Sequence, residues 1–86
     1  IYTGICLDLA CGIGFCAEHA AIAAMLQTRE TRIDAIVALG PAGIMPPCGR
    51  CRELMLQVNA DNRHSKIWLS RTQYKLLSTL LPHHWL

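Results

Sequence analysis

The segment GFCAEHAAIAAM, residues 14–25, places a cysteine and a glutamate directly ahead of an alanine-rich apolar run. From Cys16 to Leu26 the composition is that of a helix with almost no polar face, as in a helix buried on most of its sides. Gly12 and Gly14, just before it, mark a loop. We therefore expect a central helix over residues 16–26 whose first turn carries a thiol and a carboxylate.

The segments on either side of this helix alternate between strand and helix patterns. Strands are predicted at IYTGICLDL (1–9), RIDAIVALG (32–40) and KIWLS (66–70), and helices at CGRCRELMLQVN (48–59) and TQYKLLSTLL (72–81). PAGIMPP (41–47) is predicted to be a loop, because its prolines disfavour regular structure. This alternation favours an α/β domain in which at least some strands are parallel.

The length of the chain, 86 residues, fits a single domain over residues 1–86. Its 52% hydrophobic and 16% charged content is more apolar than usual, so we expect other subunits or a further segment to cover part of the surface. The chain begins at Ile1 inside a strand-like run, and we expect an N-terminal portion to precede it.

The charge and hydropathy patterns favour a small-molecule partner over nucleic acid or a membrane. The net charge is only +2, and the eight Lys and Arg residues are scattered along the chain instead of forming a basic patch. The longest uncharged apolar run, AIVALGPAGIMPPC, is broken by glycines and prolines, so it cannot span a bilayer as a helix. No signal-peptide pattern is present, and we expect a cytoplasmic protein.

The five cysteines are an odd number in a chain without an export signal, which argues against a disulfide framework. Metal binding or catalysis is the better explanation of their number. Cys6 and Cys11 lack a ligand partner at a suitable spacing and are predicted to be small buried residues.

The other three cysteines stand at the starts of the first two predicted helices. In PPCGRC, residues 46–51, Cys48 and Cys51 are three positions apart and point to one side of a helical first turn, and Cys16 has the matching place in the other helix. Unpaired N–H groups at a helix N-terminus stabilise thiolates. Three thiolates suit zinc and leave its fourth position open, as in catalytic zinc sites.

A catalytic zinc site also needs a proton carrier and a charge that offsets the thiolates. Glu18, two residues after Cys16, can take a proton from water beside the metal and return it to a substrate atom. Three thiolates give a dication a net negative site, so a nearby cation is expected. Arg50 and His19 are the main candidates for donating hydrogen bonds to this site, and Arg52 is a weaker one.

The residues alone leave two rival interpretations open. A structural zinc module would hold the metal with four protein ligands and would not need Glu18. A thiol oxidoreductase would use Cys48 and Cys51 alone and cycle between dithiol and disulfide.

CAE at 16–18 and PPCGRC at 46–51 together resemble the cytidine deaminase family, whose general signature is a His or Cys, then Glu, then Pro-Cys-x-x-Cys. YTG near the start and LLPHHW near the end also resemble family positions. The resemblance implies a three-layer α-β-α sandwich with a mixed sheet, from which an N-terminal helix and strand are missing here. It further implies zinc on Cys16, Cys48 and Cys51, with Glu18 as proton shuttle, in a homotetramer or dimer serving pyrimidine salvage.

The sequence departs from the family where the ribose is contacted. The usual Asn and Glu appear as Cys6 and Asp8, and these two, with Ala17 and Trp85, are the candidate substrate contacts. His19 stands where Arg is usual, whereas CGRC with an internal Arg is similar to the blasticidin-S deaminase branch. We expect a cytidine- or deoxycytidine-like substrate, and the alternative is blasticidin S or another aminated heterocycle.

Overall fold

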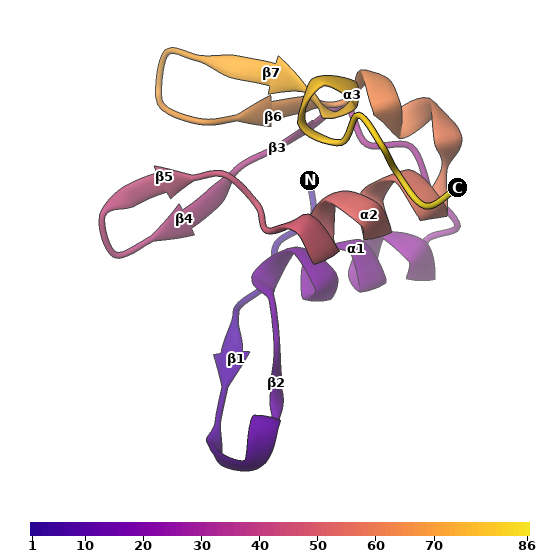
Figure 1. The fold of residues 1–86 in the computed structure, drawn as a ribbon. Helices are drawn as coiled ribbons and strands as arrows, with labels where there is room; N and C mark the ends of the chain where they lie inside the picture. Colours follow the sequence, from indigo (N-terminus) through magenta and orange to yellow (C-terminus); the bar gives the residue numbers. More distant parts are fainter. The chain divides into compact units, whose positions relative to one another are not determined.

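The computed structural model describes all residues from Ile1 to Leu86. The chain forms two compact units, Ile1–Thr31 and Arg32–Leu86, and each is described by itself (Figure 1). The prediction of one domain over residues 1–86 stays a prediction.

The first unit contains a two-stranded antiparallel hairpin. β1 (Leu7–Asp8) pairs with β2 (Gly14–Phe15), with Leu7 opposite Phe15 and Asp8 opposite Gly14. A single 3₁₀ turn, η1 (Ala10–Gly12), connects them and includes Cys11 at φ 64° and Gly12 at φ 71°. Left-handed backbone at two successive residues reverses the chain within a few positions. The hairpin leads directly to Cys16.

Helix α1 (Ala17–Gln27) completes the first unit and buries Ile22 and Met25. The N-terminal segment lies against its first turns, because a Cβ on Gly4 would come within 2.6 Å of both the Ala17 carbonyl and the Ala21 nitrogen. Only glycine permits that approach. Residues 1–6 are therefore an irregular segment. Of the buried strand predicted over residues 1–9, only Leu7 and Asp8 form a strand, and neither residue is buried.

A three-stranded mixed sheet forms the second unit's framework. β3 (Ala35–Ile36) runs parallel to β6 (Lys66–Trp68), and β6 pairs antiparallel with β7 (Tyr74–Leu76). Ile67, on the central strand, is fully buried. The expected α/β class with a mixed sheet is confirmed.

A second hairpin joins the end of the predicted strand over residues 32–40 to part of the predicted loop over residues 41–47. β4 (Ala38–Gly40) pairs with β5 (Gly43–Met45), and Gly43 has φ 112° at the turn between them. Pro41 and Pro46 lie just outside the paired residues, so they remove no hydrogen bond from the ladder. The prolines bound a short strand and do not prevent it.

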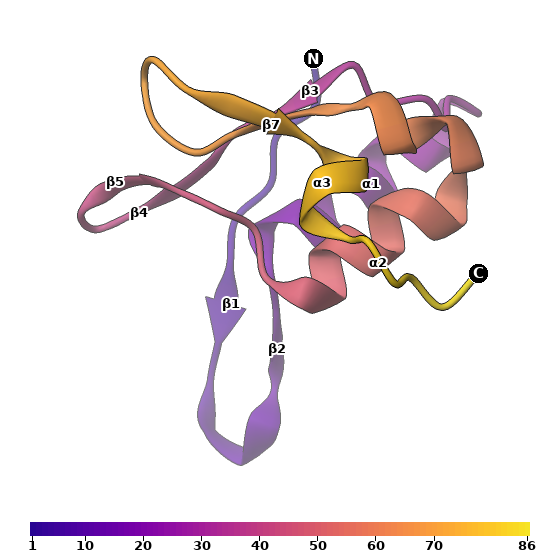
Figure 2. The same ribbon diagram turned by 45° about the horizontal axis from the view of Figure 1, so that its top comes forward.

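Helix α2 (Gly49–Val58) follows this hairpin and buries Cys51, Met55 and Leu56, as its apolar spacing predicts. A 3₁₀ helix, η2 (Ala60–His64), then leads into β6. In the segment 72–81 the helix prediction is largely wrong: residues 74–76 form β7, and only α3 (Leu77–Leu80) is helical (Figure 2). The cross-strand contact of Tyr74 with Trp68, at 5.1 Å between ring centroids, favours the extended form.

Two buried polar residues join the segments of the second unit. Asn62 accepts from the Ile33 N–H at 2.7 Å and donates to the Met55 carbonyl at 2.8 Å. The Ser65 hydroxyl donates to the Ile33 carbonyl, and the Ser65 backbone carbonyl accepts from the Leu77 N–H at 3.0 Å. Both residues are almost completely buried, so these bonds satisfy polar groups of Asn62 and Ser65 that water does not reach.

Candidate metal centre

Cysteines occupy the N-cap positions of both α1 and α2. Cys16 has φ −70° and ψ 151°, and Cys48 has φ −69° and ψ 168°, the extended backbone of an N-cap, and neither sulfur makes a capping hydrogen bond. Ser, Thr, Asp and Asn are the residues that normally satisfy the free N–H groups there. A cysteine at both caps therefore indicates a role for the thiols other than helix capping.

At the start of α2, the two cysteines of CGRC lie side by side. The Sγ atoms of Cys48 and Cys51 are 3.5 Å apart, within a hydrogen bond's reach for sulfur. Cys48 is exposed, whereas Cys51, one turn into the helix, is fully buried. No cysteine of the chain forms a disulfide.

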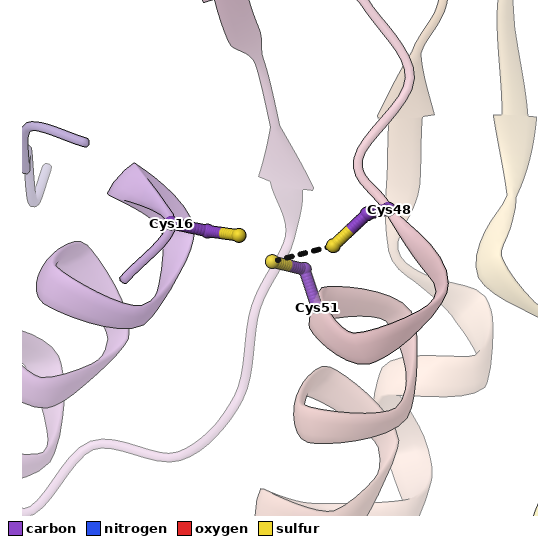
Figure 3. Close-up of side chains that lie close together, drawn as sticks. All are labelled: Cys16, Cys48 and Cys51. Atoms are coloured by element: carbon purple, nitrogen blue, oxygen red, sulfur yellow. Dashed lines mark hydrogen bonds between the residues drawn. The ribbon is translucent and has the colours of Figure 1, made fainter. Parts of the chain in front are cut away.

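The sulfur of Cys16 belongs to the same group of potential metal ligands. The Sγ atoms of Cys16, Cys48 and Cys51 all lie within 4.8 Å of one another, and Figure 3 shows the sulfur of Cys51 between those of the other two. Around a tetrahedral zinc with Zn–S bonds of ~2.3 Å, two sulfurs are about 3.8 Å apart. The donor set and its spacing therefore fit a zinc ion with three thiolates.

Glu18 is the second residue of α1 and lies in the first turn of that helix, which directly follows its N-cap, Cys16. Its side chain is half-buried. The backbone N–H of the next residue, His19, donates to the Cys16 carbonyl at 3.0 Å, which closes this turn.

The three candidate cations have different surroundings. Arg50 is exposed, in the first turn of α2. The His19 Nε2 atom is buried and has no hydrogen-bond partner. Arg52 is half-buried and donates Nε to the Pro47 carbonyl at 2.9 Å and Nη1 to the Leu80 carbonyl at 3.1 Å. Neither bond of Arg52 was predicted from the sequence. The position of Arg52 four residues after Cys48 could have indicated the bond to Pro47, but no local signal indicates the bond to Leu80.

The candidate substrate contacts lie at several places along the chain. Cys6 precedes β1, Asp8 is in β1, and both are exposed. Ala17 is the half-buried first residue of α1. Trp85 has an exposed side chain, and its backbone N–H donates to Glu53 Oε1 at 2.9 Å.

Two further sequence predictions can be compared with the structure. The prediction that Cys6 and Cys11 are buried is wrong, because both are exposed. Cys6 immediately precedes the β1–β2 hairpin and Cys11 lies in its turn, where no residue is buried. None of the helices is both long and apolar enough to cross a membrane.

No protein-family model matches the sequence, and no curated protein matches it either. Several solved structures do, and they are cytidine deaminases. The enzyme from Mycobacterium tuberculosis superposes with a TM-score of 0.74 and 28% identity over 91% of this chain, and a mutant of the same enzyme scores 0.75. The enzyme from Mycobacterium leprae gives 0.75 with 29% identity over 91% of the chain.

A more distant match, the cytidine deaminase from Burkholderia pseudomallei, has a TM-score of 0.65 at 22% identity. The chain spans 62% of the length of the M. tuberculosis enzyme and 65% of that from M. leprae. The α/β fold with a mixed sheet that the sequence predicts is thus the fold seen in these cytidine deaminases.

Proposed function

We propose that this protein is a zinc-dependent hydrolytic deaminase, a hydrolase of the C–N bond in a cyclic amidine. The observation that carries the proposal is the group of three cysteine sulfurs within 4.8 Å of one another, with Glu18 two residues after the first of them. The structural similarity to cytidine deaminases supports the proposal, because those proteins are named for this activity.

Cys16, Cys48 and Cys51 would hold the zinc as thiolates, and the group contains no fourth side chain. Zinc held by three protein ligands supplies a Lewis acid with one open position, at which it lowers the pKa of water. The positive ends of the α1 and α2 dipoles, where Cys16 and Cys48 are the N-caps, would favour the thiolate form. A four-ligand structural zinc module lacks an equivalent of the open position.

Glu18 would carry the protons of the reaction. Its carboxylate takes a proton from the attacking water and delivers it to the ring nitrogen next to the amine-bearing carbon. The carboxylate then takes the remaining proton from the hydroxyl group added to that carbon and delivers it to the exocyclic amine nitrogen. The carbon–nitrogen bond breaks as the hydroxyl oxygen becomes the carbonyl oxygen, and ammonia leaves. Because one carboxylate acts in successive transfers, its loss affects more than one step of the reaction.

The proposed substrate is an aminated pyrimidine nucleoside such as cytidine or deoxycytidine. Cys6, Asp8, Ala17 and Trp85 are the proposed substrate contacts. Cys6 and Asp8 stand where the family places its ribose-contacting Asn and Glu. That change, together with the Arg inside CGRC, keeps blasticidin S or another aminated heterocycle as the alternative substrate.

We expect this protein to release ammonia from at least one aminated heterocycle when it is loaded with zinc. A screen of cytidine, deoxycytidine and blasticidin S, with ammonia measured by a coupled assay, distinguishes the two substrate classes. Protein treated with a chelator and then reloaded with zinc serves as the control, since a zinc enzyme loses and regains activity together with the metal. Zinc-bound protein that releases no ammonia from any of these compounds would count against a deaminase.

Arg50 is proposed to offset the negative charge of the three thiolates. We expect Arg50→Gln to leave the melting temperature nearly unchanged and to lower turnover or zinc affinity about 10- to 100-fold, the usual scale for partners of metal ligands. His19→Ala is the companion variant, because the buried Nε2 of His19 lies one turn after Cys16. If Arg50→Gln left turnover and zinc affinity unchanged while His19→Ala lowered them strongly, His19 would be the group that offsets the thiolate charge.

Assembly into a homodimer or homotetramer is part of the same proposal. Large apolar side chains are exposed on both hairpins and at the chain ends, among them Ile1, Ile5, Ile13, Leu39, Trp85 and Leu86. A second subunit would remove such surface from water. We place the enzyme in cytoplasmic pyrimidine salvage.

A further inference from the structure

Arg52 bonds to the backbone on both sides of a proposed zinc ligand. Its side-chain Nε donates to the carbonyl of Pro47 at 2.9 Å, and its backbone N–H donates to the carbonyl of Cys48 at 3.0 Å. One residue thus binds two consecutive carbonyl groups, those immediately before and after the Cys48 Cα.

These two carbonyls belong to the two peptide planes that meet at the Cys48 Cα. Because each peptide unit is planar, holding both planes fixes the two dihedral angles between them, here φ −69° and ψ 168°. The direction of the Cα–Cβ bond follows from those angles. The backbone bond is the first i→i−4 bond of α2, which any residue except proline could make at position 52, whereas the bond to the Pro47 carbonyl is specific to the Arg side chain. Through that bond Arg52 restrains the direction from which Cys48 presents its side chain.

Cys48 needs this support more than Cys51 does. Cys51 lies within α2 and is fully buried, so the helix and its packing hold its backbone. Cys48 is exposed at the N-cap, outside the regular helix, and its sulfur makes no capping bond.

The second side-chain bond of Arg52 holds the guanidinium in place. Nη1 donates to the carbonyl of Leu80, the last residue of α3, at 3.1 Å. A helix's last carbonyls lack partners within the helix and accept readily from Arg. The planar guanidinium presents both donors at a fixed angle, which the single ammonium of Lys cannot reproduce.

We propose that Arg52 is the positioning residue for Cys48, setting the direction of that thiolate for metal binding. This inference rests on the proposed zinc site. Arg52 then acts through the backbone next to Cys48, whereas the sequence indicated it as a candidate donor to a cysteine sulfur.

Cobalt(II) in place of zinc tests the role without relying on activity, because sulfur-to-cobalt absorption reports thiolate coordination. We expect Arg52→Gln to bind cobalt about 10- to 100-fold more weakly than the parent and to change that absorption. Arg52→Lys should be intermediate. Arg71→Gln, the same change at an exposed arginine in the turn between β6 and β7, should match the parent.

The Cys48→Ser background shows whether Arg52 acts through Cys48. If it does, adding Arg52→Gln to Cys48→Ser should weaken cobalt binding by much less than it does in the parent. An equal effect in both backgrounds, or folded Arg52→Gln with parent affinity and absorption, would overturn the proposal.

Circular dichroism separates a local effect from unfolding. Should Arg52→Gln not fold, Arg52→Lys carries the same comparison, and failure of both to fold would make Arg52 a general structural residue and refute the specific role. A parent without thiolate absorption would instead refute the zinc site itself, which distinguishes failure of the proposed function from failure at Arg52.

Discussion

Glu18→Gln is expected to keep the zinc and the fold while lowering turnover by about 10⁴-fold, the upper end for general acid–base catalysis. The amide matches the carboxylate in size but cannot accept and release a proton at neutral pH. Since Glu18 is proposed to act in successive proton transfers, a single change affects each of them. Zinc content, melting temperature and ammonia release, measured on the same preparation, check this prediction.

Glu30→Gln is the matched control. Glu30 is exposed and accepts a hydrogen bond from the Tyr2 hydroxyl through Oε2, and an amide oxygen can still accept that bond. It should therefore behave like the parent. Ammonia release by Glu18→Gln at near the parent rate would show that the proton-transfer assignment is wrong.

Cys16→Ser is expected to remove zinc and activity together. The parent should bind one zinc per chain. Losing a residue that supports a metal ligand typically lowers zinc affinity about 10- to 100-fold, and the loss in Cys16→Ser should be larger because a ligand itself is removed. Metal analysis after dialysis measures the change. Cys11→Ser alters an exposed thiol in the hairpin turn and should keep the full zinc content.

The same variant discriminates between the rival functions. A dithiol oxidoreductase built on Cys48 and Cys51 would keep its redox activity in Cys16→Ser, since those two sulfurs remain 3.5 Å apart. A structural zinc module would show four protein ligands by X-ray absorption of the parent, where the proposed site should show three sulfurs and one lighter atom.

Local sequence pattern was sufficient to predict the elements that carry the site. The helix starts at residues 16 and 48 followed from the composition after each cysteine, and the structure begins α1 and α2 one residue later in both cases. The local pattern gave the wrong secondary structure where pairing with a strand distant in the sequence determines the conformation. Residues 74–76 have helix-like spacing but extend along β6, because Tyr74 packs on Trp68 and the Lys66 ammonium lies 5.1 Å from the Tyr74 ring centroid.

The same distinction applies to the candidate metal centre. Two cysteines three apart in a helix must lie close together, so their proximity could be predicted from spacing alone. The bond from Arg52 to Leu80 joins residues 28 positions apart in the sequence. This bond forms because β6, β7 and α3 bring the chain back to α2, and no local sequence pattern predicts that arrangement.

The buried amide of Asn62 limits how this sequence can vary through evolution. Its oxygen accepts from Ile33 while its nitrogen donates to Met55, so an Asp would set an oxygen against a carbonyl and a Leu would leave both backbone groups unsatisfied. Each unsatisfied buried group costs about 1–3 kcal/mol, and a small domain has only about 5–15 kcal/mol in total. Selection on foldability alone would therefore keep an amide at this position in descendants that have changed their substrate.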